Sequence, residues 1–230
     1  MALEYDFTDR VVMVTGAAGA LGRAVAGAFA DAGATVCGVD VVAPDDPLDG
    51  VDYETVDLTD EPAVAALFDT VVERYGWLDA LCNIAGTWQG GTPIHETSLS
   101  EYERMFDVNL TTMFLASKHA LPHLQETGGT IVSVSARASL EGGTGDGPYR
   151  AAKAGVRLLT ETIAAENEDT VRANAVMPSV IDTPANREAM PDADHSKWVD
   201  PADIARVVMF LSSPESRATS GAAVPVYGEA

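Results

Sequence analysis

The chain has 230 residues, of which 47% are hydrophobic and 21% are charged. This balance excludes a disordered chain and a fibrous repeat. A chain of this length is expected to fold as one domain spanning residues 1–230. Asp and Glu number 35 against 14 Lys and Arg, so the formal net charge is −21. Because so acidic a surface repels nucleic acid and anionic lipid headgroups, the charge argues against a protein that binds either of them.

Three lysines and eleven arginines make up the cations. With the many carboxylates, this imbalance is typical of adaptation to high salt (a halophilic protein), and an ordinary acidic enzyme is the alternative. No apolar run approaches eighteen residues and no signal peptide is visible, so we expect a cytoplasmic protein. Cys37 and Cys82 lie in apolar runs without metal-ligand spacing and are expected to be buried thiols.

Short runs rich in β-branched residues alternate with segments of helical periodicity, which predicts repeated βαβ units and a parallel sheet covered on both faces. The predicted strands are Val11–Thr15, Thr35–Asp40, Tyr53–Asp57, Leu78–Cys82, Thr130–Ser135, Val171–Val176 and Ala223–Val226. The predicted helices are Leu21–Ala32, Pro62–Tyr75, Ser100–Leu124, Tyr149–Asn167 and Pro201–Leu211. The fold class is therefore a three-layer, doubly wound α/β sheet, the Rossmann fold.

Three stretches carry no periodicity: Gly86–Leu99, Arg137–Pro148 and Pro178–Val199. Each follows the carboxyl end of a predicted strand, where open α/β sheets bind their ligands. We expect these stretches to form the walls of the binding site, with residues 178–200 as the substrate loop.

A glycine-rich turn, Thr15-Gly16-Ala17-Ala18-Gly19-Ala20-Leu21-Gly22, leads from the first strand into a helix. Glycines there let main-chain N–H groups approach a pyrophosphate, whose charge the helix N-terminus favours. The second strand ends at Asp40, where a carboxylate can accept hydrogen bonds from both ribose hydroxyls of the adenosine. This pairing predicts a dinucleotide site, whereas the glycine turn alone is also compatible with a turn that binds nothing.

Asp40 also predicts a preference between cofactors, because a 2′-phosphate beside it would meet like-charge repulsion of a few kcal/mol, taking an effective dielectric of about 20. NAD(H) is therefore expected over NADP(H). Asp57 and Leu58 at the end of the third strand can pair with adenine. A role for Asp57 as a helix cap or turn residue is equally compatible with its position.

Tyr149 and Lys153 place a phenol and an ammonium one helical turn apart on one face. A phenol is a poor acid–base group at neutral pH, and a neighbouring cation lowers its pKa. This spacing predicts a proton-transfer pair. An amphipathic helix with a surface lysine is the alternative.

Together these motifs resemble the short-chain dehydrogenase/reductase superfamily over nearly the whole chain. The matching features are Thr15–Gly22, Asp40, Asp57, Asn83–Gly86, Asn109, Tyr149, Lys153 and Pro178–Thr183. The resemblance implies that Tyr149 is the proton donor or acceptor, that Lys153 holds the nicotinamide ribose and tunes the tyrosine, and that Asn109 orders a water. It also implies strand order 3-2-1-4-5-6-7. The implied cofactor-binding residues are Gly16, Gly19, Ala20, Leu21, Asp40, Asp57, Leu58, Asn83, Ala85, Gly86, Tyr149, Lys153, Pro178, Ile181 and Thr183.

The chain departs from the family pattern at three positions. Ala20 replaces the middle glycine of the turn, and Ser179 replaces a glycine after Pro178. At the position of the substrate-orienting serine, thirteen residues before Tyr149, the chain has Ala136. Ser133, Ser135 and Ser139 lie nearby, but a persisting strand would turn Ser135 to the opposite face. The dihydropteridine reductase branch is similar in lacking this serine, and the segment Asp182–Trp198 also resembles that branch.

Several further residues have two interpretations each. Trp88 and Trp198 either sandwich a planar substrate or pack within loops. Arg137 either meets an anionic substrate or pairs with surface acids. Surplus apolar residues on the helices Ser100–Leu124 and Tyr149–Asn167 favour a homodimer or homotetramer. The four histidines lack ligand spacing, so no metal site is expected.

From the motifs and the resemblance together, we expect a reversible oxidoreductase of a small alcohol or carbonyl compound, with a dihydropteridine reductase and a non-catalytic NAD(H) sensor as alternatives.

Overall fold

Seven parallel strands form the centre of the molecule in a computed structural model that describes residues 5–229. Their order is β3-β2-β1-β4-β5-β6-β7, and each neighbouring pair is parallel. The strands are β1 Val11–Thr15, β2 Thr35–Asp40, β3 Val51–Thr55, β4 Ala80–Asn83, β5 Thr130–Val134, β6 Arg172–Pro178 and β7 Ala223–Val226. The predicted fold class and strand order are confirmed.

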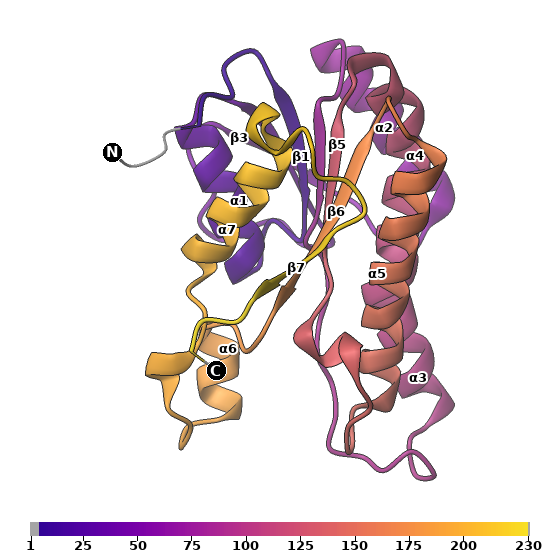
Figure 1. Cartoon of the computed structure of the whole chain (residues 1–230), viewed down its shortest axis with the longest axis vertical. Coiled ribbons are helices and arrows are strands. Elements are labelled where there is room, and N and C mark those ends of the chain that lie inside the picture. The colour runs from indigo at the N-terminus through magenta and orange to yellow at the C-terminus, as the bar shows by residue number, and fades with distance from the viewer. Residues whose placement is uncertain (1–4, 230) are drawn as a thin grey trace.

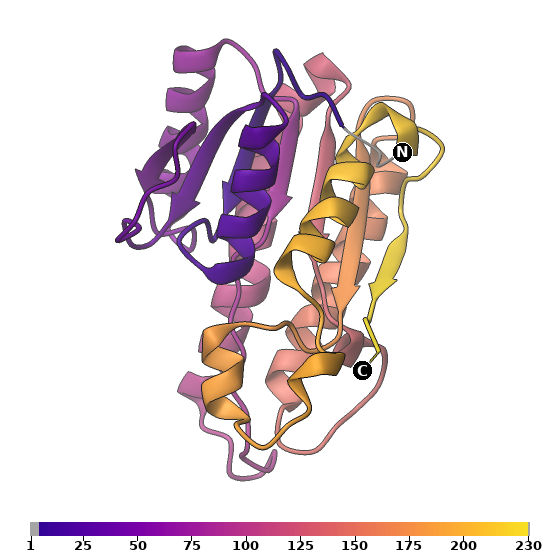
Figure 2. The same cartoon turned by 90° about the vertical axis from the view of Figure 1, so that its left-hand side faces the viewer.

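Helices cover both faces of this sheet (Figures 1 and 2). One face carries α1 Ala20–Asp31 and α7 Pro201–Ser212, and the other carries α2 Glu61–Tyr75, α4 Thr112–Thr127 and α5 Gly147–Glu166. The alternation of side chains along each strand explains the two layers of core. In β1, Val12 and Val14 pack on the α1 and α7 side, whereas Val11 and Met13 pack on the opposite side.

The predicted helix Ser100–Leu124 was wrong in one respect, because the structure divides it. It consists of α3 Leu99–Phe106, a π-helical turn Asp107–Thr111, and α4. A π-turn adds one residue to a helix and is frequent at functional sites. Asn109 lies in this turn and is buried, and its Nδ2 donates to the carbonyl of Met105 at 3.0 Å. The interruption therefore coincides with a residue that the sequence predicts for the site.

The bounds of four strands also differ from the prediction, by one residue at the end of β5 and by one or two residues in β3, β4 and β6. β3 begins and ends two residues before the predicted Tyr53–Asp57. Asp57 lies beyond the strand because its Oδ1 accepts hydrogen bonds from the main chain and hydroxyl of Thr59, and this local turn ends the extended conformation. β4 is likewise displaced along the chain to Ala80–Asn83.

The stretch Pro178–Val199 is more ordered than the absence of periodicity suggests. Its first residue, Pro178, is the last residue of β6, and the stretch then contains α6 Pro184–Ala189 and a 3-10 turn His195–Lys197. The two segments are capped by the side chains of Thr183 and Asp194. We call residues 179–199 the flap, and it lies below the carboxyl ends of β6 and β7 in Figure 2.

Both cysteines are free and buried, as predicted. Burial raises the pKa of Cys37 and of Cys82 to about 12, so both remain protonated thiols at neutral pH. Within residues 5–229, no helix is both long enough and apolar enough to cross a membrane.

Candidate active site

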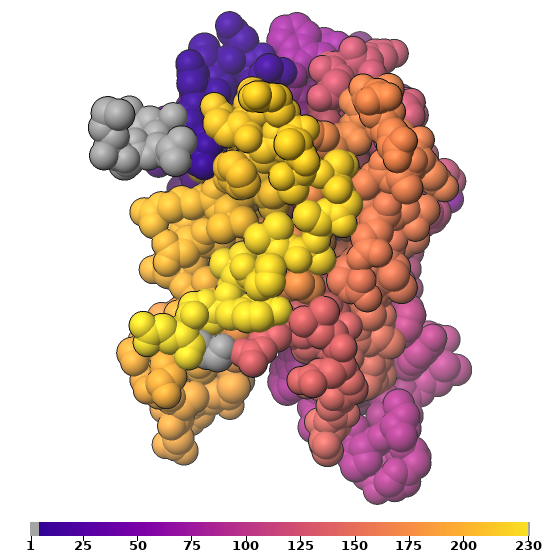
Figure 3. Space-filling model, in the orientation of Figure 1, coloured from indigo at the N-terminus to yellow at the C-terminus, as the bar shows by residue number. Residues whose placement is uncertain are grey.

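Two adjoining cavities lie along the carboxyl edge of the sheet, with volumes of about 800 and 720 Å³. They share Leu21, Ile84 and Gly86. The glycine-rich turn lines the smaller cavity, which we call the nucleotide cavity. Tyr149 and Lys153 line the larger one, which we call the reaction cavity. Figure 3 shows the molecule hollowed at its lower end, between the flap and the loops opposite it.

The glycine turn brings the ends of β1 and β4 into close contact. Gly16 has a φ of 68°, and a Cβ there would lie 2.8 Å from Ala85 Cα, so only glycine fits. Thr15 Oγ1 accepts hydrogen bonds from the amides of Ile84 and Ala85 at 3.0 and 3.1 Å. The N-cap residue Gly19 has no capping side chain, so the first amides of α1 remain available to an anion.

Asp40 is held in place by the main chain at the end of β2. Its Oδ2 accepts from the amide of Ala18 at 3.0 Å and its Oδ1 from the amide of Val41 at 2.8 Å. The carboxylate therefore ties β2 to the glycine turn while it lines the nucleotide cavity. Its position fits a group that receives ribose hydroxyls.

Asp57 serves the turn and lines the cavity as well. Its hydrogen bonds with Thr59 lower the pKa of the carboxyl group, and Leu58 beside it is buried. The two interpretations of Asp57, as a turn residue and as a nucleotide-facing residue, are compatible in this geometry.

The nucleotide cavity gathers most of the residues that the resemblance assigns to the cofactor. These are Gly16, Gly19, Ala20, Leu21, Asp40, Asp57, Leu58, Ala85 and Gly86. Asn83 and Thr183 line neither cavity. Asn83 is buried and its Nδ2 donates to Ser117 and Ser133, while Thr183 caps α6. These two side chains support the cavity walls from behind.

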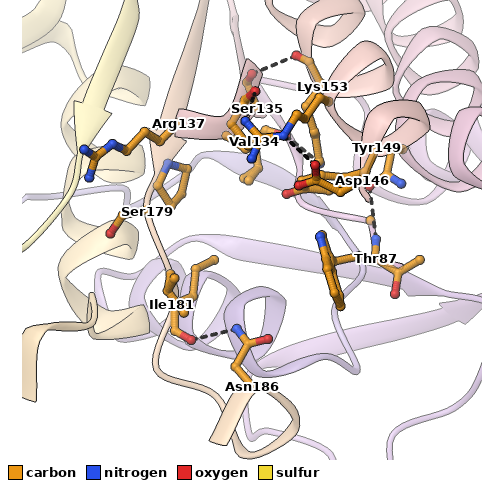
Figure 4. Close-up of a pocket in the computed structure, with 18 of the residues that line it drawn as sticks. Thr87, Val134, Ser135, Arg137, Asp146, Tyr149, Lys153, Ser179, Ile181 and Asn186 are labelled. Carbon is orange, nitrogen blue, oxygen red and sulfur yellow. Dashed lines mark hydrogen bonds and ion pairs between the residues drawn. The ribbon is translucent and has the colours of Figure 1, made fainter. Parts of the chain in front are cut away.

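Tyr149 and Lys153 both face the reaction cavity from the first turns of α5 (Figure 4). Lys153 is buried, and its Nζ donates to the carbonyl of Val134 at 2.8 Å. A Cβ on Gly86 would lie 3.0 Å from that Nζ and 2.8 Å from Asn109 Oδ1. Glycine at position 86 therefore leaves the ammonium and the amide open to the junction of the two cavities.

The pKa values of Tyr149 and Lys153 are both shifted by burial, and that of Tyr149 shifts in the direction opposite to the expectation. Burial and the nearby carboxylate of Asp146 raise the pKa of Tyr149 to about 12, an effect that Arg150 partly opposes. Burial lowers the pKa of Lys153 to about 8. The pKa of Tyr149 is therefore raised where the tyrosine–lysine spacing predicted a lowering, because burial of the phenol and the Asp146 carboxylate both disfavour the tyrosinate.

Asn109 reaches the same point from the π-turn. Its Oδ1 accepts from the amide of Thr87 at 3.1 Å, and its Nδ2 binds Met105, so both ends of the amide have partners. Asn109 therefore fixes the start of the loop after β4 and lines the reaction cavity together with Lys153.

The family model described as enoyl-(acyl carrier protein) reductase matches residues 16–228. A cis-4-hydroxycyclohexanecarboxylate dehydrogenase from Sinomonas cyclohexanicum is 33% identical in an alignment 240 positions long, gaps included, that covers 96% of this chain and 96% of that protein. The chain belongs to the short-chain dehydrogenase/reductase superfamily. It is an oxidoreductase of that superfamily, with relatives that are dehydrogenases.

Two solved structures of this superfamily match nearly the whole chain. The aldohexose dehydrogenase of Thermoplasma acidophilum, in ligand-free form, has a TM-score of 0.90 at 30% identity and covers 97% of this chain and 94% of its own. The carveol dehydrogenase of Mycobacterium avium, in complex with NAD, has a TM-score of 0.86 at 28% identity and covers 96% and 97%.

The serine position typical of the superfamily contains no hydroxyl in this short-chain oxidoreductase. Ala136 lines the reaction cavity just beyond β5. Ser133 accepts from Asn83, Ser135 donates to the carbonyl of Lys153 at 2.8 Å, and Ser139 donates to the sulfur of Met177 at 3.9 Å. Each neighbouring serine has a partner within the protein, and only Ser135 lines the cavity. None of the three is therefore placed as a free substitute.

The loops on either side of the reaction cavity touch each other through glycines. The amide of Gly91 donates to the carbonyl of Gly145 at 2.8 Å. A Cβ on Gly90 would lie 2.7 Å from the Trp88 ring and 3.1 Å from Asp146 Cβ. This contact joins loops about fifty-five positions apart and builds one cavity wall. In the sequence, the only signal for this contact between the two loops is that both stretches are rich in glycine and turn residues.

The remaining candidates divide between the cavity and the surface. Trp88 lines the reaction cavity, whereas the ring of Trp198 packs 4.4 Å from that of His195 within the flap. Arg137 lines the cavity mouth, but its guanidinium points away toward β7, over the ring of Tyr227 at 5.0 Å (Figure 4). Among the described residues, no group of three or more His, Cys, Asp or Glu is arranged to hold a metal ion.

Proposed function

We propose that this protein catalyses reversible hydride transfer between NAD(H) and a small alcohol or carbonyl compound, with Tyr149 as the acid–base residue. The observation that carries the proposal is the position of Tyr149 and Lys153 in a cavity that adjoins the nucleotide cavity and shares Leu21, Ile84 and Gly86 with it. A substrate there would lie between the phenol and the end of a dinucleotide that extends from the glycine turn.

The residues present fit a nicotinamide dinucleotide. Gly16 and Gly86 stand where any Cβ would collide with neighbouring atoms, and the N-terminus of α1 offers free amides for the pyrophosphate. Asp40 would accept the hydroxyls of the adenosine ribose, and Lys153 would contact the ribose next to the nicotinamide. When bound, the cofactor supplies or accepts the hydride.

The protein's own side chains carry out the proton transfer in this proposal. During reduction, Tyr149 gives its hydroxyl proton to the carbonyl oxygen as the hydride reaches the carbonyl carbon, and an alcohol results. During oxidation, the tyrosinate takes the hydroxyl proton of the alcohol, the hydrogen on the same carbon departs with the C–H electron pair as hydride, and a carbonyl compound results. Lys153 holds the positive charge beside the phenol, and Asn109 positions the loop that borders it.

NAD(H) is the proposed cofactor in preference to NADP(H). Main-chain amides donate hydrogen bonds to both carboxylate oxygens of Asp40, so the side chain is fixed in place and would repel a 2′-phosphate. The NAD complex of the carveol dehydrogenase supports this assignment by likeness.

A quinonoid dihydropteridine reductase activity is the second candidate, and Ala136 favours it. Reduction of such a pterin needs no hydroxyl donor at that position. The exposed ring of Trp88 at the cavity offers a flat surface to a planar substrate. A non-catalytic NAD(H)-sensing protein, with the flap as the responding element, is the alternative in which Tyr149 has no chemical role.

Self-association through α4 and α5 is also part of the proposal. Phe114 and Leu158 on these helices are 47% and 52% exposed, while most other apolar residues predicted as surplus are buried within the fold. A homodimer or homotetramer would cover them, and a monomer mass by light scattering would contradict this.

The proposed setting of the protein is the cytoplasm at high ionic strength. A melting temperature that rises between low and molar KCl would support the adaptation to high salt.

NADH oxidation with a substrate panel tests the proposed function. The panel contains ketones, sugars, 3-oxoacyl esters and quinonoid dihydrobiopterin. Turnover of carbonyl compounds supports the first candidate, and turnover of the pterin alone supports the second. NADH binding without turnover of any member would contradict both enzymatic proposals and favour the sensor.

A further inference from the structure

Asp146 occupies the N-cap position of α5 but does not cap the helix. Aspartate at an N-cap normally accepts a hydrogen bond from an amide in the first turn. Here φ is −132° and ψ is 30°, and the side chain makes no capping hydrogen bond. The carboxylate must therefore have another role, although its helix has a full twenty residues to stabilise.

The carboxylate instead faces the reaction cavity beside Tyr149. Asp146 lines that cavity, its side chain is 13% exposed, and Figure 4 shows it with Tyr149 at the α5 edge of the pocket. Its Oδ1 accepts from Arg150 Nε at 2.6 Å. Within residues 5–229, no hydrogen bond is made to Oδ2. One carboxylate oxygen is thus engaged by Arg150, and the other has no hydrogen-bond partner among the described residues.

Arg150 fixes the direction of this carboxylate. Besides Asp146, its Nη1 contacts the carbonyls of Ala138 and Glu141 at 3.4 and 3.2 Å. Glycine at position 143 is what leaves room for the guanidinium, because a Cβ there would overlap it. Gly90 packs against the β-carbon of Asp146 on the other side. The carboxylate is therefore pre-positioned, which lowers the entropy cost of binding a ligand group.

The charges of Asp146 and Arg150 determine which kind of donor group can give a hydrogen bond to Asp146 Oδ2. Arg150 pairs with Asp146 at 2.6 Å, so this carboxylate is not an unpaired anion that would attract a cation. A carboxylate oxygen beside a paired guanidinium is suited to a neutral donor such as a hydroxyl. Asp146 and Tyr149 line the same cavity, one from the N-cap position of α5 and the other from its first turn.

We propose that Asp146 is a specificity-determining residue that accepts a hydrogen bond from a second hydroxyl next to the reacting carbon. The substrates are then vicinal diols, polyols and their α-hydroxycarbonyl partners rather than mono-alcohols. This inference rests on the proposed function, because the reacting carbon is defined by Tyr149. It adds the substrate class, which neither the glycine turn nor the tyrosine–lysine pair specifies.

Matched substrate pairs that differ by one hydroxyl test the proposal. The pairs are butane-2,3-diol with butan-2-ol, and cyclohexane-1,2-diol with cyclohexanol, each oxidised with NAD⁺. The measured quantity is the ratio of kcat/KM for diol over mono-alcohol at one pH. A ratio within each variant cancels any change in the ionisation of Tyr149. We expect the wild-type ratio to exceed about 10, as loss of a hydrogen bond to a charged group costs roughly tenfold or more.

Three variants separate recognition from support of the loop. Asp146→Ala should bring the ratio close to 1. Arg150→Met keeps the carboxylate but removes the ion pair that orients it, so it should lower absolute rates and leave a ratio clearly above that of Asp146→Ala. Asp203→Asn breaks an exposed aspartate–arginine pair on α7, with Arg206 at 2.7 Å, and should leave rates and ratio unchanged.

The outcomes distinguish this inference from the proposed function. Turnover without diol preference, or a preference that survives Asp146→Ala, overturns the role of Asp146 while the oxidoreductase stands. Equal loss of the ratio in Asp146→Ala and Arg150→Met overturns it as well, since Asp146 would then act only through the loop. Failure to oxidise any member of the pairs, with no reduction of the matching ketones and hydroxyketones, contradicts both proposals.

Discussion

Lys153 Nζ donates a hydrogen bond of 2.8 Å to the carbonyl oxygen of Val134, the last residue of β5. The hydroxyl of Ser135 donates to the carbonyl of Lys153 itself at 2.8 Å. These two bonds, in opposite directions, anchor α5 to the end of the sheet one turn after Tyr149. The proposed acid–base residue is therefore positioned by the end of β5, two residues before Ala136.

The buried ammonium should make stability depend on pH. Its pKa is lowered to about 8 in the folded protein, whereas an unfolded lysine titrates near 10.4. Between these values the unfolded chain binds more protons, so the free energy of unfolding rises with pH. Relative to Lys153→Met, the wild type should gain up to about 3 kcal/mol between pH 8 and pH 10.5. Urea unfolding of both proteins across this range measures the effect. A difference independent of pH would contradict it.

Restoring a hydroxyl at Ala136 should reveal the substrate type. Ala136 is buried, lines the reaction cavity and has an extended backbone, so serine fits there with one added atom. A donor to a developing oxyanion is typically worth about 10² to 10³ in rate. Ala136→Ser should raise kcat for carbonyl substrates by about tenfold or more and leave pterin reduction unchanged. An unchanged rate for a confirmed carbonyl substrate would show that another group already supplies this hydrogen bond.

The pH profile of alcohol oxidation should move when Asp146 is neutralised. Oxidation requires the tyrosinate, and Asp146 is one cause of the raised pKa of Tyr149. Asp146→Asn removes that negative charge, so the pKa falls and the alkaline rise in rate shifts to lower pH. A mono-alcohol substrate isolates this effect from diol binding. The variant Asp203→Asn is the control and should keep the wild-type profile, and an unshifted profile for Asp146→Asn would contradict the assignment of Tyr149 as base.

Asp40 should control the choice between NAD(H) and NADP(H). Asp40→Ala removes the charge that repels a 2′-phosphate and the acceptor for the ribose hydroxyls. We expect KM for NADH to rise and KM for NADPH to fall, so that the preference changes by about tenfold or more. Steady-state kinetics with both cofactors measures it. An unaltered preference would mean that the adenosine ribose lies elsewhere.

The regular elements were predictable because each has a local signal. The β-branched runs of β1 and β2 and the glycine turn between them depend on neighbours in the sequence. The strand-end residues of the nucleotide cavity follow from the parallel topology alone. The interruption of the helix around Asn109 was not predictable from helical periodicity, and the hydrogen bond between Asn109 and the amide of Thr87 joins two segments that are distant in the sequence.

The reaction cavity depends more on long-range contacts than the nucleotide cavity does. The glycine contact between Gly91 and Gly145 and the position of Arg150 across Gly143 join segments with no shared periodicity. The ionisation of Tyr149 likewise depends on burial and on Asp146, which the tyrosine–lysine spacing does not reveal. Sequence patterns predicted Tyr149 and Lys153 as a pair, whereas the surroundings of the two side chains depend on tertiary packing.

Tyr149→Phe, measured for NADH binding and for turnover in parallel, tests the central claim most directly. Phenylalanine keeps the ring and removes only the hydroxyl, so the fold and the nucleotide cavity are preserved. The account predicts an NADH dissociation constant within about threefold of wild type and a fall in kcat of at least roughly 10². A variant that binds NADH and retains most of its turnover would show that the proton comes from another group.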